Sequence, residues 1–245
     1  MLLGTAVLAL IAAACGSGES TGLEVSFSQA TPTPGPVLLV TATPPTADTP
    51  TPPPAITGLL IPIEGACLPQ VDDLMPNAPR DYREGVHEGV DFYSYASCTD
   101  LPKGTPVLAV KTGRIVRADH GYQDLTPDTL AALEERVAAG EANAFDVVDA
   151  FRGRQVWIDH GGGVVTRYAH LSAVDEAIQV GMVVKVGSVV GYVGDSGTPE
   201  SVRAPGTEDH LHFEIRVGDG YLGQGLPPAE VRALYEAAFA PEEAQ

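Results

Sequence analysis

The feature that most constrains the fold is a series of short segments in which apolar and polar residues alternate. The series runs from Leu59 onward, and turn residues separate its members, which include TPVLAVKTGRIVRADH, RQVWIDHG, GVVTRYAHLS, GMVVKVGSVVGYVGDSG and LHFEIRVGDG. Alternation with a period of two is typical of strands, and glycine and proline favour the turns between them. The pattern therefore predicts a mostly β domain over residues 58–245.

Helical patterns interrupt this series once and follow it once. The segment LTPDTLAALEERVAAG has Thr126 as an N-cap and Pro127 at the first helical position, and NAFDVVDAFRG ends at Gly153. We expect a single insertion of two helices over residues 122–153. The tail PPAEVRALYEAAFA has its apolar residues on one helical face, which predicts a short C-terminal helix docked on the domain.

The first 57 residues lie outside this pattern. Residues 1–15 form an apolar run of signal-peptide length, too short to span a membrane. Small residues precede Cys15, which resembles a bacterial lipoprotein signal, although no Lys or Arg precedes the run and Ala12 stands where leucine is usual. An ordinary secretory signal is the alternative. Either signal predicts export, and the first also predicts a lipid anchor on Cys15.

Proline and threonine dominate the following stretch, residues 16–57, especially QATPTPGPVLLVTATPPTADTPTPPPA. Such a composition cannot bury a core, so we expect an extended tether that is partly polyproline II. At about 3.1 Å per residue, this run reaches roughly 80 Å.

Charge and cysteine content limit the partners. The chain has 32 acidic and 14 basic residues, a formal net charge of −18, which argues against nucleic acid because phosphate binding needs clustered Lys and Arg. Besides Cys15 the chain has Cys67 and Cys98, which flank VHEGVDFYSY. In an exported chain such a pair predicts a disulfide; a metal-ligand role is less expected because neither cysteine belongs to a CxxC pair.

The segment EDHLHFEIRVGDG places two histidines two residues apart at the start of an expected strand. Residues i and i+2 of a strand share a face, so His210 and His212 project together while Leu211 and Phe213 turn toward the core. An isolated pair of this kind is most often half-exposed at a strand edge. It becomes a candidate metal site only when other ligands exist.

Other ligands are found in REGVHEGVDFY, where His87 and Asp91 are four residues apart. A helical HExxH site is a possible alternative, but Gly89 and the final aspartate disfavour a helix. In extended chain His87 and Asp91 also share a face. Glu88 would then point away, and it has no predicted role.

A further histidine, His170, ends the expected strand in TRYAHLS. The two histidines that remain, His120 and His160, precede glycine and are expected in turns. Catalytic zinc commonly takes three protein ligands and leaves a fourth position to water or substrate. The five candidates His87, Asp91, His170, His210 and His212 therefore divide naturally into three ligands and two helpers.

These motifs resemble the lysostaphin/LytM-type zinc endopeptidases of bacterial cell walls, which have a duplicated hybrid motif fold. HEGVD, PKGTPVLAVKTGRIV, VWIDHGGGVVTRYAHLS, VKVGSVVGYVGDSG and HLHFEIR occur in the family's order over roughly residues 84 to 220, apart from the insertion. The resemblance implies a compact antiparallel β-sheet domain with one zinc ion at the floor of an open groove. It implies His87, Asp91 and His212 as metal ligands, with His210 and His170 as catalytic histidines.

The implied function is zinc-dependent hydrolysis of peptide cross-links or stem peptides of peptidoglycan, by a monomer tethered at the cell envelope. Alternatives are a noncatalytic wall-binding or hydrolase-activating member of the same fold, and a zinc enzyme that cleaves other peptides. A structural zinc site is disfavoured because such sites usually have four ligands, often cysteines. The sequence departs from the family in FYSYASCTDL, in TPESVRAPGTEDHLH and in the insertion, which we expect to act as a lid, a specificity element or an inhibitory cover.

Overall fold

The computed structural model describes residues 56–241. The expected signal peptide, Cys15 and nearly all of the expected tether lie outside the described residues. Within residues 56–241, no helix is long and apolar enough to cross a membrane.

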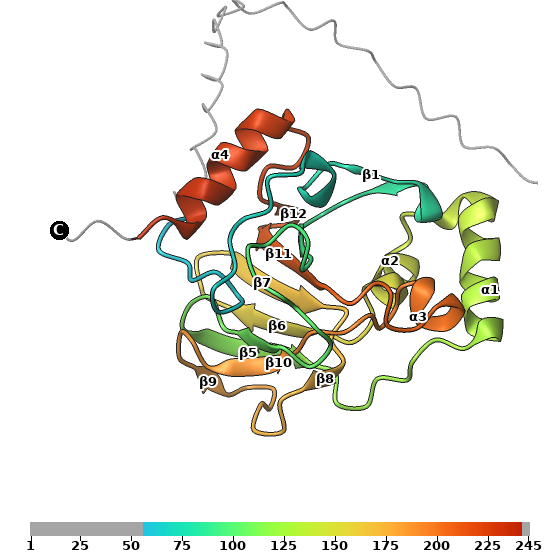
Figure 1. Ribbon diagram of the computed structural model, residues 1–245, viewed down its shortest axis with the longest axis horizontal. Helices are drawn as coiled ribbons and strands as arrows, with labels where there is room; N and C mark the ends of the chain where they lie inside the picture. Colours follow the sequence, from blue (N-terminus) through green and yellow to red (C-terminus); the bar gives the residue numbers. More distant parts are fainter. Residues whose placement is uncertain (1–55, 242–245) are drawn as a thin grey trace, which may run out of the picture. The chain divides into compact units, whose positions relative to one another are not determined.

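Three antiparallel sheets form the described domain (Figure 1). The largest has the order β12-β11-β7-β6-β5-β9, and β3 also pairs with β11. Its strands are β3 (Val90–Phe92), β5 (Gly113–Ala118), β6 (Val156–Asp159), β7 (Val164–Ala169), β9 (Val183–Val184), β11 (Leu211–Val217) and β12 (Gly220–Tyr221). The second sheet has the order β4-β10-β8, and the third pairs β1 with β2; their bounds are β4 (Pro106–Leu108), β8 (Ala173–Val174), β10 (Val189–Tyr192), β1 (Pro79–Arg80) and β2 (Gly85–Val86). The predicted mostly β, antiparallel fold is confirmed.

The two-helix insertion lies between β5 and β6, as expected. It consists of α1 (Pro127–Arg136), a π-helical turn (Val137–Glu141) and α2 (Phe145–Arg152). The Thr126 side chain accepts a hydrogen bond from the Thr129 main-chain N–H, which confirms the predicted N-cap. The insertion has a small apolar cluster of its own, formed by Leu130, Val137, Ala142, Val147 and Phe151.

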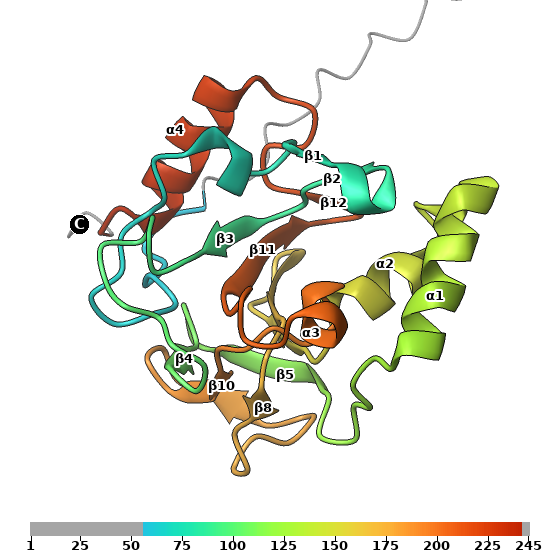
Figure 2. The ribbon, with the colours of Figure 1, turned by 45° about the vertical axis from the view of Figure 1, so that its right-hand side comes forward.

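The loop before β11 contains α3 (Glu200–Arg203), which lies beside the insertion (Figure 2). Val202 packs against the insertion's apolar cluster, and Arg203 pairs with Glu134 of α1. Within the long segment TPESVRAPGTEDH, α3 therefore packs against the inserted helices.

The main core lies between the sheets and the C-terminal helix α4 (Pro228–Phe239). Leu211 and Phe213 of β11 point into it, as the alternation predicted. On α4, Val231, Tyr235 and Ala238 are fully buried, which confirms the docked helix.

Cys67 and Cys98 form the expected disulfide, with their Cα atoms 5.5 Å apart. The bridge closes a loop that contains two short 3₁₀ helices, Asp72–Leu74 and Asp81–Arg83, together with β1, β2 and β3. The loop carries His87 and Asp91, so the disulfide ties both ends of a segment that has little regular structure.

Candidate functional site

Strand pairing brings together two of the residues singled out from the sequence. In the β3–β11 ladder Asp91 is the direct partner of His212, and on its other side His212 is paired with Ala169 at the end of β7. A carboxylate and an imidazole that lie 121 residues apart in sequence therefore face each other across neighbouring strands.

His87 reaches the same point from the irregular segment between β2 and β3. Its main-chain N–H donates to the Ala78 carbonyl at 2.8 Å, and its own carbonyl accepts from Asn77 N–H at 2.8 Å. Because residues 87–89 depart from strand geometry, the strict alternation expected there fails. The prediction that Glu88 points away is wrong, since Glu88 lines the same cavity as His87.

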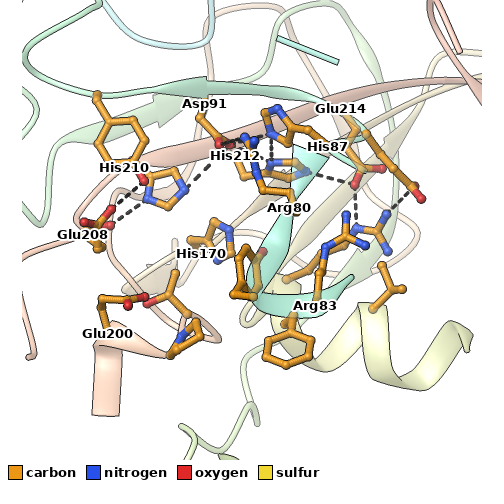
Figure 3. A pocket seen from close by; sticks show the side chains of 18 residues that line it. Arg80, Arg83, His87, Asp91, His170, Glu200, Glu208, His210, His212 and Glu214 are labelled. Atoms are coloured by element: carbon orange, nitrogen blue, oxygen red, sulfur yellow. Dashed lines mark hydrogen bonds and ion pairs between the residues drawn. The ribbon is translucent and has the colours of Figure 1, made fainter. Parts of the chain in front are cut away.

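Three ligand-type atoms converge closely (Figure 3). His87 Nε2 lies 2.9 Å from Asp91 Oδ1 and 2.9 Å from His212 Nδ1, and His212 Nδ1 lies 2.8 Å from Asp91 Oδ1. All three side chains are buried. This group can hold a metal ion.

Hydrogen bonds on the outer side of each ring fix the protons. His87 Nδ1 donates to the Met75 carbonyl at 3.0 Å, and His212 Nε2 donates to Glu214 Oε1 at 3.1 Å. Neighbouring arginines hold the pKa of Glu214 well below its usual range although burial opposes this, so the carboxylate is an acceptor only. In neutral rings the inner nitrogens are then unprotonated, and with Asp91 they form three acceptors that face one another. Two imidazole nitrogens and a carboxylate oxygen suit zinc, and outer-side acceptors of this kind are typical of metal-binding histidines.

Burial and hydrogen bonds to neighbouring groups act in opposite directions on the pKa values of the three residues of this cluster. Burial lowers the pKa of His87 to about 4. Burial also opposes protonation of His212, but hydrogen bonds to Asp91 and Glu214 outweigh it and raise the pKa of His212. Burial would raise the pKa of Asp91, whereas His87 and His212 hold it well below its usual range.

Arg80 completes the surroundings of Asp91 and was not anticipated from the sequence. Its Nη2 donates to Asp91 Oδ2 at 2.7 Å, while Oδ1 of the same carboxylate faces the two histidines. Arg80 also donates to the main-chain carbonyls of Asp73 and Pro79, so its own position is fixed. The two carboxylate oxygens thus have separate roles.

His170 and His210 lie next to this cluster, with ring centroids 4.6 Å apart. His170 Nδ1 donates to the Ser196 carbonyl at 2.8 Å, and His210 Nδ1 donates to the Glu208 carbonyl at 2.7 Å. Burial lowers the pKa of both imidazoles, and neighbouring histidines add to this for His170. Both rings are therefore neutral near pH 7, with Nε2 as the basic nitrogen.

The orientation of His210 is fixed further by stacking. The Tyr93 ring lies parallel to it at a centroid distance of 4.3 Å, and the Tyr93 hydroxyl donates to Glu208 at 2.8 Å. His210 Nε2 is 3.7 Å from Asp91 Oδ1.

All five predicted residues line one cavity of about 290 Å³. Val148, Phe151 and Arg152 of α2 form part of its wall, so the insertion does border the site as expected. His120 and His160 lie elsewhere: His120 bonds to the Ile178 carbonyl, and His160 bonds to the Thr112 carbonyl and the Thr166 hydroxyl.

The fold and the site define an antiparallel β domain with a cluster able to hold a metal ion and two more histidines beside it. The chain belongs to Peptidase family M23. The family model matches residues 85–223, which are more than half of this chain. The family resemblance seen in the sequence motifs is thereby confirmed.

Individual relatives match parts of the chain. The DD-carboxypeptidase/endopeptidase Mpg of Neisseria meningitidis serogroup B is 36% identical over 104 residues, which are 39% of this chain and 22% of that protein. Lysostaphin of Staphylococcus staphylolyticus is 27% identical over 139 residues, which are 57% of this chain and 20% of that protein. The match thus spans about a fifth of each relative. Among solved structures, the catalytic domain of lysostaphin from Staphylococcus simulans has 26% identity and a TM-score of 0.37, covering 58% of this chain and 74% of that one.

Proposed function

We propose that this protein is a zinc-dependent endopeptidase that hydrolyses peptide cross-links or stem peptides of bacterial peptidoglycan. The observation that carries the proposal is the convergence of three buried acceptor atoms beside two neutral histidines in one cavity. Membership of Peptidase family M23 and the endopeptidase named among the relatives support it.

His87, Asp91 and His212 would hold one zinc ion through His87 Nε2, His212 Nδ1 and Asp91 Oδ1. When bound, the ion would lower the pKa of a water molecule toward about 7 and polarise the scissile carbonyl.

His210 is the proposed general base. Its Nδ1 is occupied by the Glu208 carbonyl, so its Nε2 is the atom that would take the proton from the attacking water. Asp91 Oδ1 lies 3.7 Å from this nitrogen and would stabilise the imidazolium that forms. The proton can then pass from Nε2 to the leaving amine.

His170, whose ring centroid lies 4.6 Å from that of His210, is proposed to orient the reacting groups. Its neutral Nε2 would accept a hydrogen bond from the attacking water and so orient that water toward the scissile carbonyl. Because both rings have Nδ1 fixed by a carbonyl, the roles of His170 and His210 are exchangeable in principle.

We further infer that residues 1–15 direct export, that residues 16–57 act as a tether and that residues 58–245 form the peptidase domain. The lipid anchor on Cys15, the location facing the cell wall and the monomeric state are likewise proposals from the sequence. A Cys15→Ala protein is expected to lose flotation with membranes.

Analysis of the reaction products tests the function. The full chain is incubated with purified peptidoglycan, and soluble fragments are identified by mass spectrometry. Hydrolysis of a peptide bond must create one new amino terminus and one new carboxyl terminus per cut. Binding to the wall material without new termini would instead support the noncatalytic alternative.

A further inference from the structure

The metal cluster and the inserted helix α2 share one carboxylate oxygen. Glu214 Oε1 accepts from His212 Nε2 at 3.1 Å and from Arg152 Nε at 2.5 Å. Glu214 is fully buried, and Arg152 is 6% exposed. Figure 3 shows Glu214 beside His212, on the side of the cluster away from His210. The orientation of one imidazole therefore depends on a carboxylate that an inserted residue holds.

The Arg152 guanidinium is fixed by a second acidic group. Its Nη2 donates to Glu88 Oε2 at 2.6 Å, and Arg216 Nη1 donates to the same oxygen at 2.5 Å. Arg216 Nη1 also lies 3.2 Å from Glu214 Oε2. Arg152, Glu88, Arg216 and Glu214 thus form a closed ring of ion pairs, in which only Arg152 comes from the insertion.

The main chain at the end of α2 supports the second half of the site. The Arg152 carbonyl accepts from His170 N–H at 2.9 Å, and the Arg154 carbonyl accepts from Leu171 N–H at 3.1 Å. Gly153 lies so close to Ser196 that a Cβ would be 2.1 Å from the Ser196 oxygen, the same oxygen that accepts from His170 Nδ1. The main chain at the exit from the insertion therefore supports His170, while the Arg152 side chain reaches Glu214 beside His212.

The rest of α2 is held both by β5 and by the insertion's apolar cluster, which fixes the position of Arg152 at the end of the helix. Asp149 accepts from Arg117 of β5 at 2.6 Å, and Val147 and Phe151 are buried in the insertion's own apolar cluster. A helix held by a sheet strand and by its own core is a rigid base. Helix α2 is therefore part of the packed domain rather than a lid, because Val147 and Phe151 are buried and Arg152 bonds to the buried Glu214.

We propose that Arg152 is a positioning residue for His212, acting through Glu214, and that the two-helix insertion thereby holds the metal site in its binding geometry. The inference rests on the proposed function only in taking zinc as the ligand of His87, Asp91 and His212. Without the Arg152 guanidinium, Glu214 Oε2 keeps its contacts with Arg167 and Arg216. Glu214 Oε1, however, loses the donor at the shorter distance and keeps only His212.

Zinc affinity tests this without any need for activity. The dissociation constant of the full chain is measured by competition with a chromophoric chelator, and the cobalt(II)-substituted protein is followed by its visible absorption. We expect Arg152→Gln to bind zinc about 10-fold more weakly, with altered cobalt bands, because loss of a direct partner such as Glu214 typically costs about 10- to 100-fold and Arg152 acts through that partner. Arg152→Lys keeps the charge but not the fork, so it is expected to recover part of the loss.

Arg136→Gln is the matched control. Arg136 is in the same insertion and pairs with Asp146 and Glu141, both within the insertion. Its loss should leave zinc affinity and the cobalt spectrum unchanged. The double variant Arg152→Gln/Glu214→Gln should bind zinc no more weakly than Glu214→Gln alone, since coupled residues are not additive.

The outcomes separate this inference from the proposed function. A wild-type chain that binds no zinc would refute the metal site and this inference with it. A wild-type chain that binds zinc, with Arg152→Gln of equal affinity and identical spectrum, would refute the inference alone. If Arg152→Gln does not fold, wild-type affinity together with a wild-type cobalt spectrum in Arg152→Lys would do the same.

Discussion

Gly89 lies directly against the main-chain carbonyl of Phe213, and a Cβ at position 89 would be 2.3 Å from that oxygen. The absence of a side chain allows the start of β3 to approach β11, which places Asp91 opposite His212. The glycine of HEGVD is therefore a requirement of packing between the two segments that supply the cluster.

Replacement of Gly89 by alanine is expected to push β3 away from β11, because the clash is with main-chain atoms. Zinc affinity should fall at least tenfold, and the free energy of unfolding should fall by about 1–3 kcal/mol. Gly121→Ala is the control, since nothing lies within 4 Å of a Cβ there. Chelator competition and urea unfolding measure both effects. Wild-type zinc affinity in Gly89→Ala would show that this close approach does not set the cluster geometry.

Arg80→Gln removes the donor to Asp91 Oδ2 and frees the carboxylate to rotate. We expect about tenfold weaker zinc binding, as for other partners of metal ligands. Arg232→Gln is the comparison, because Arg232 pairs with Asp72 and neither residue lines the cavity. Equal zinc dissociation constants for Arg80→Gln and Arg232→Gln would contradict the orienting role of Arg80.

The Cys67–Cys98 disulfide restricts the loop that carries His87 and Asp91. Its sequence separation of 31 predicts a contribution of about 2–4 kcal/mol to the free energy of unfolding, through the reduced entropy of the unfolded chain. The Cys67→Ala/Cys98→Ala protein should unfold at correspondingly lower urea concentration. A reductant should destabilise only the wild type. Equal stability of the two proteins would show that the loop is held by other contacts.

The ion pair between Asp149 and Arg117 gives the insertion a pH-dependent attachment. Burial would raise the pKa of Asp149, but hydrogen bonds from Arg117 and Gln155 outweigh it and lower the pKa. A lowered carboxyl pKa stabilises the fold above the unfolded value of about 4, and this contribution is lost as the pH falls through the folded pKa. Asp149→Asn should therefore cost about 1 kcal/mol at pH 7, and progressively less below pH 4.

Urea unfolding at pH 7, 5 and 3 measures this difference between Asp149→Asn and wild type. Glu64→Gln, at an exposed position, should show little difference at any of these pH values. A destabilisation by Asp149→Asn that is as large at pH 3 as at pH 7 would show that the charge of Asp149 is not its source.

Local patterns were sufficient to predict much of the fold. The alternation of HLHFEIR places His212 and Leu211 on opposite faces of β11, and Thr126 with Pro127 marks the start of α1. The convergence of His87, Asp91 and His212 followed from the family resemblance, since nothing local relates residues 121 positions apart.

The contacts that sequence reasoning missed are long-range or irregular. Glu88 was expected to point away, which holds for a regular strand but not for the irregular segment 87–89. Arg152 contacts Glu214, which lies 62 residues away in the sequence. Arg152 belongs to the insertion, which lies outside the family motifs, so the motifs could not place its side chain. The residues around Gly89 indicate an extended segment, but they do not show that the Phe213 main chain lies against this glycine.

The most direct test of the central claim is a paired measurement on the full chain: zinc content by elemental analysis and peptide release from purified peptidoglycan. Wild type, His210→Ala and His212→Ala are compared. We expect one zinc ion in wild type and in His210→Ala, a strongly reduced zinc content in His212→Ala, and peptide release by the wild type only. Absence of zinc from the wild type, or release by His210→Ala at the wild-type rate, would contradict the central claim.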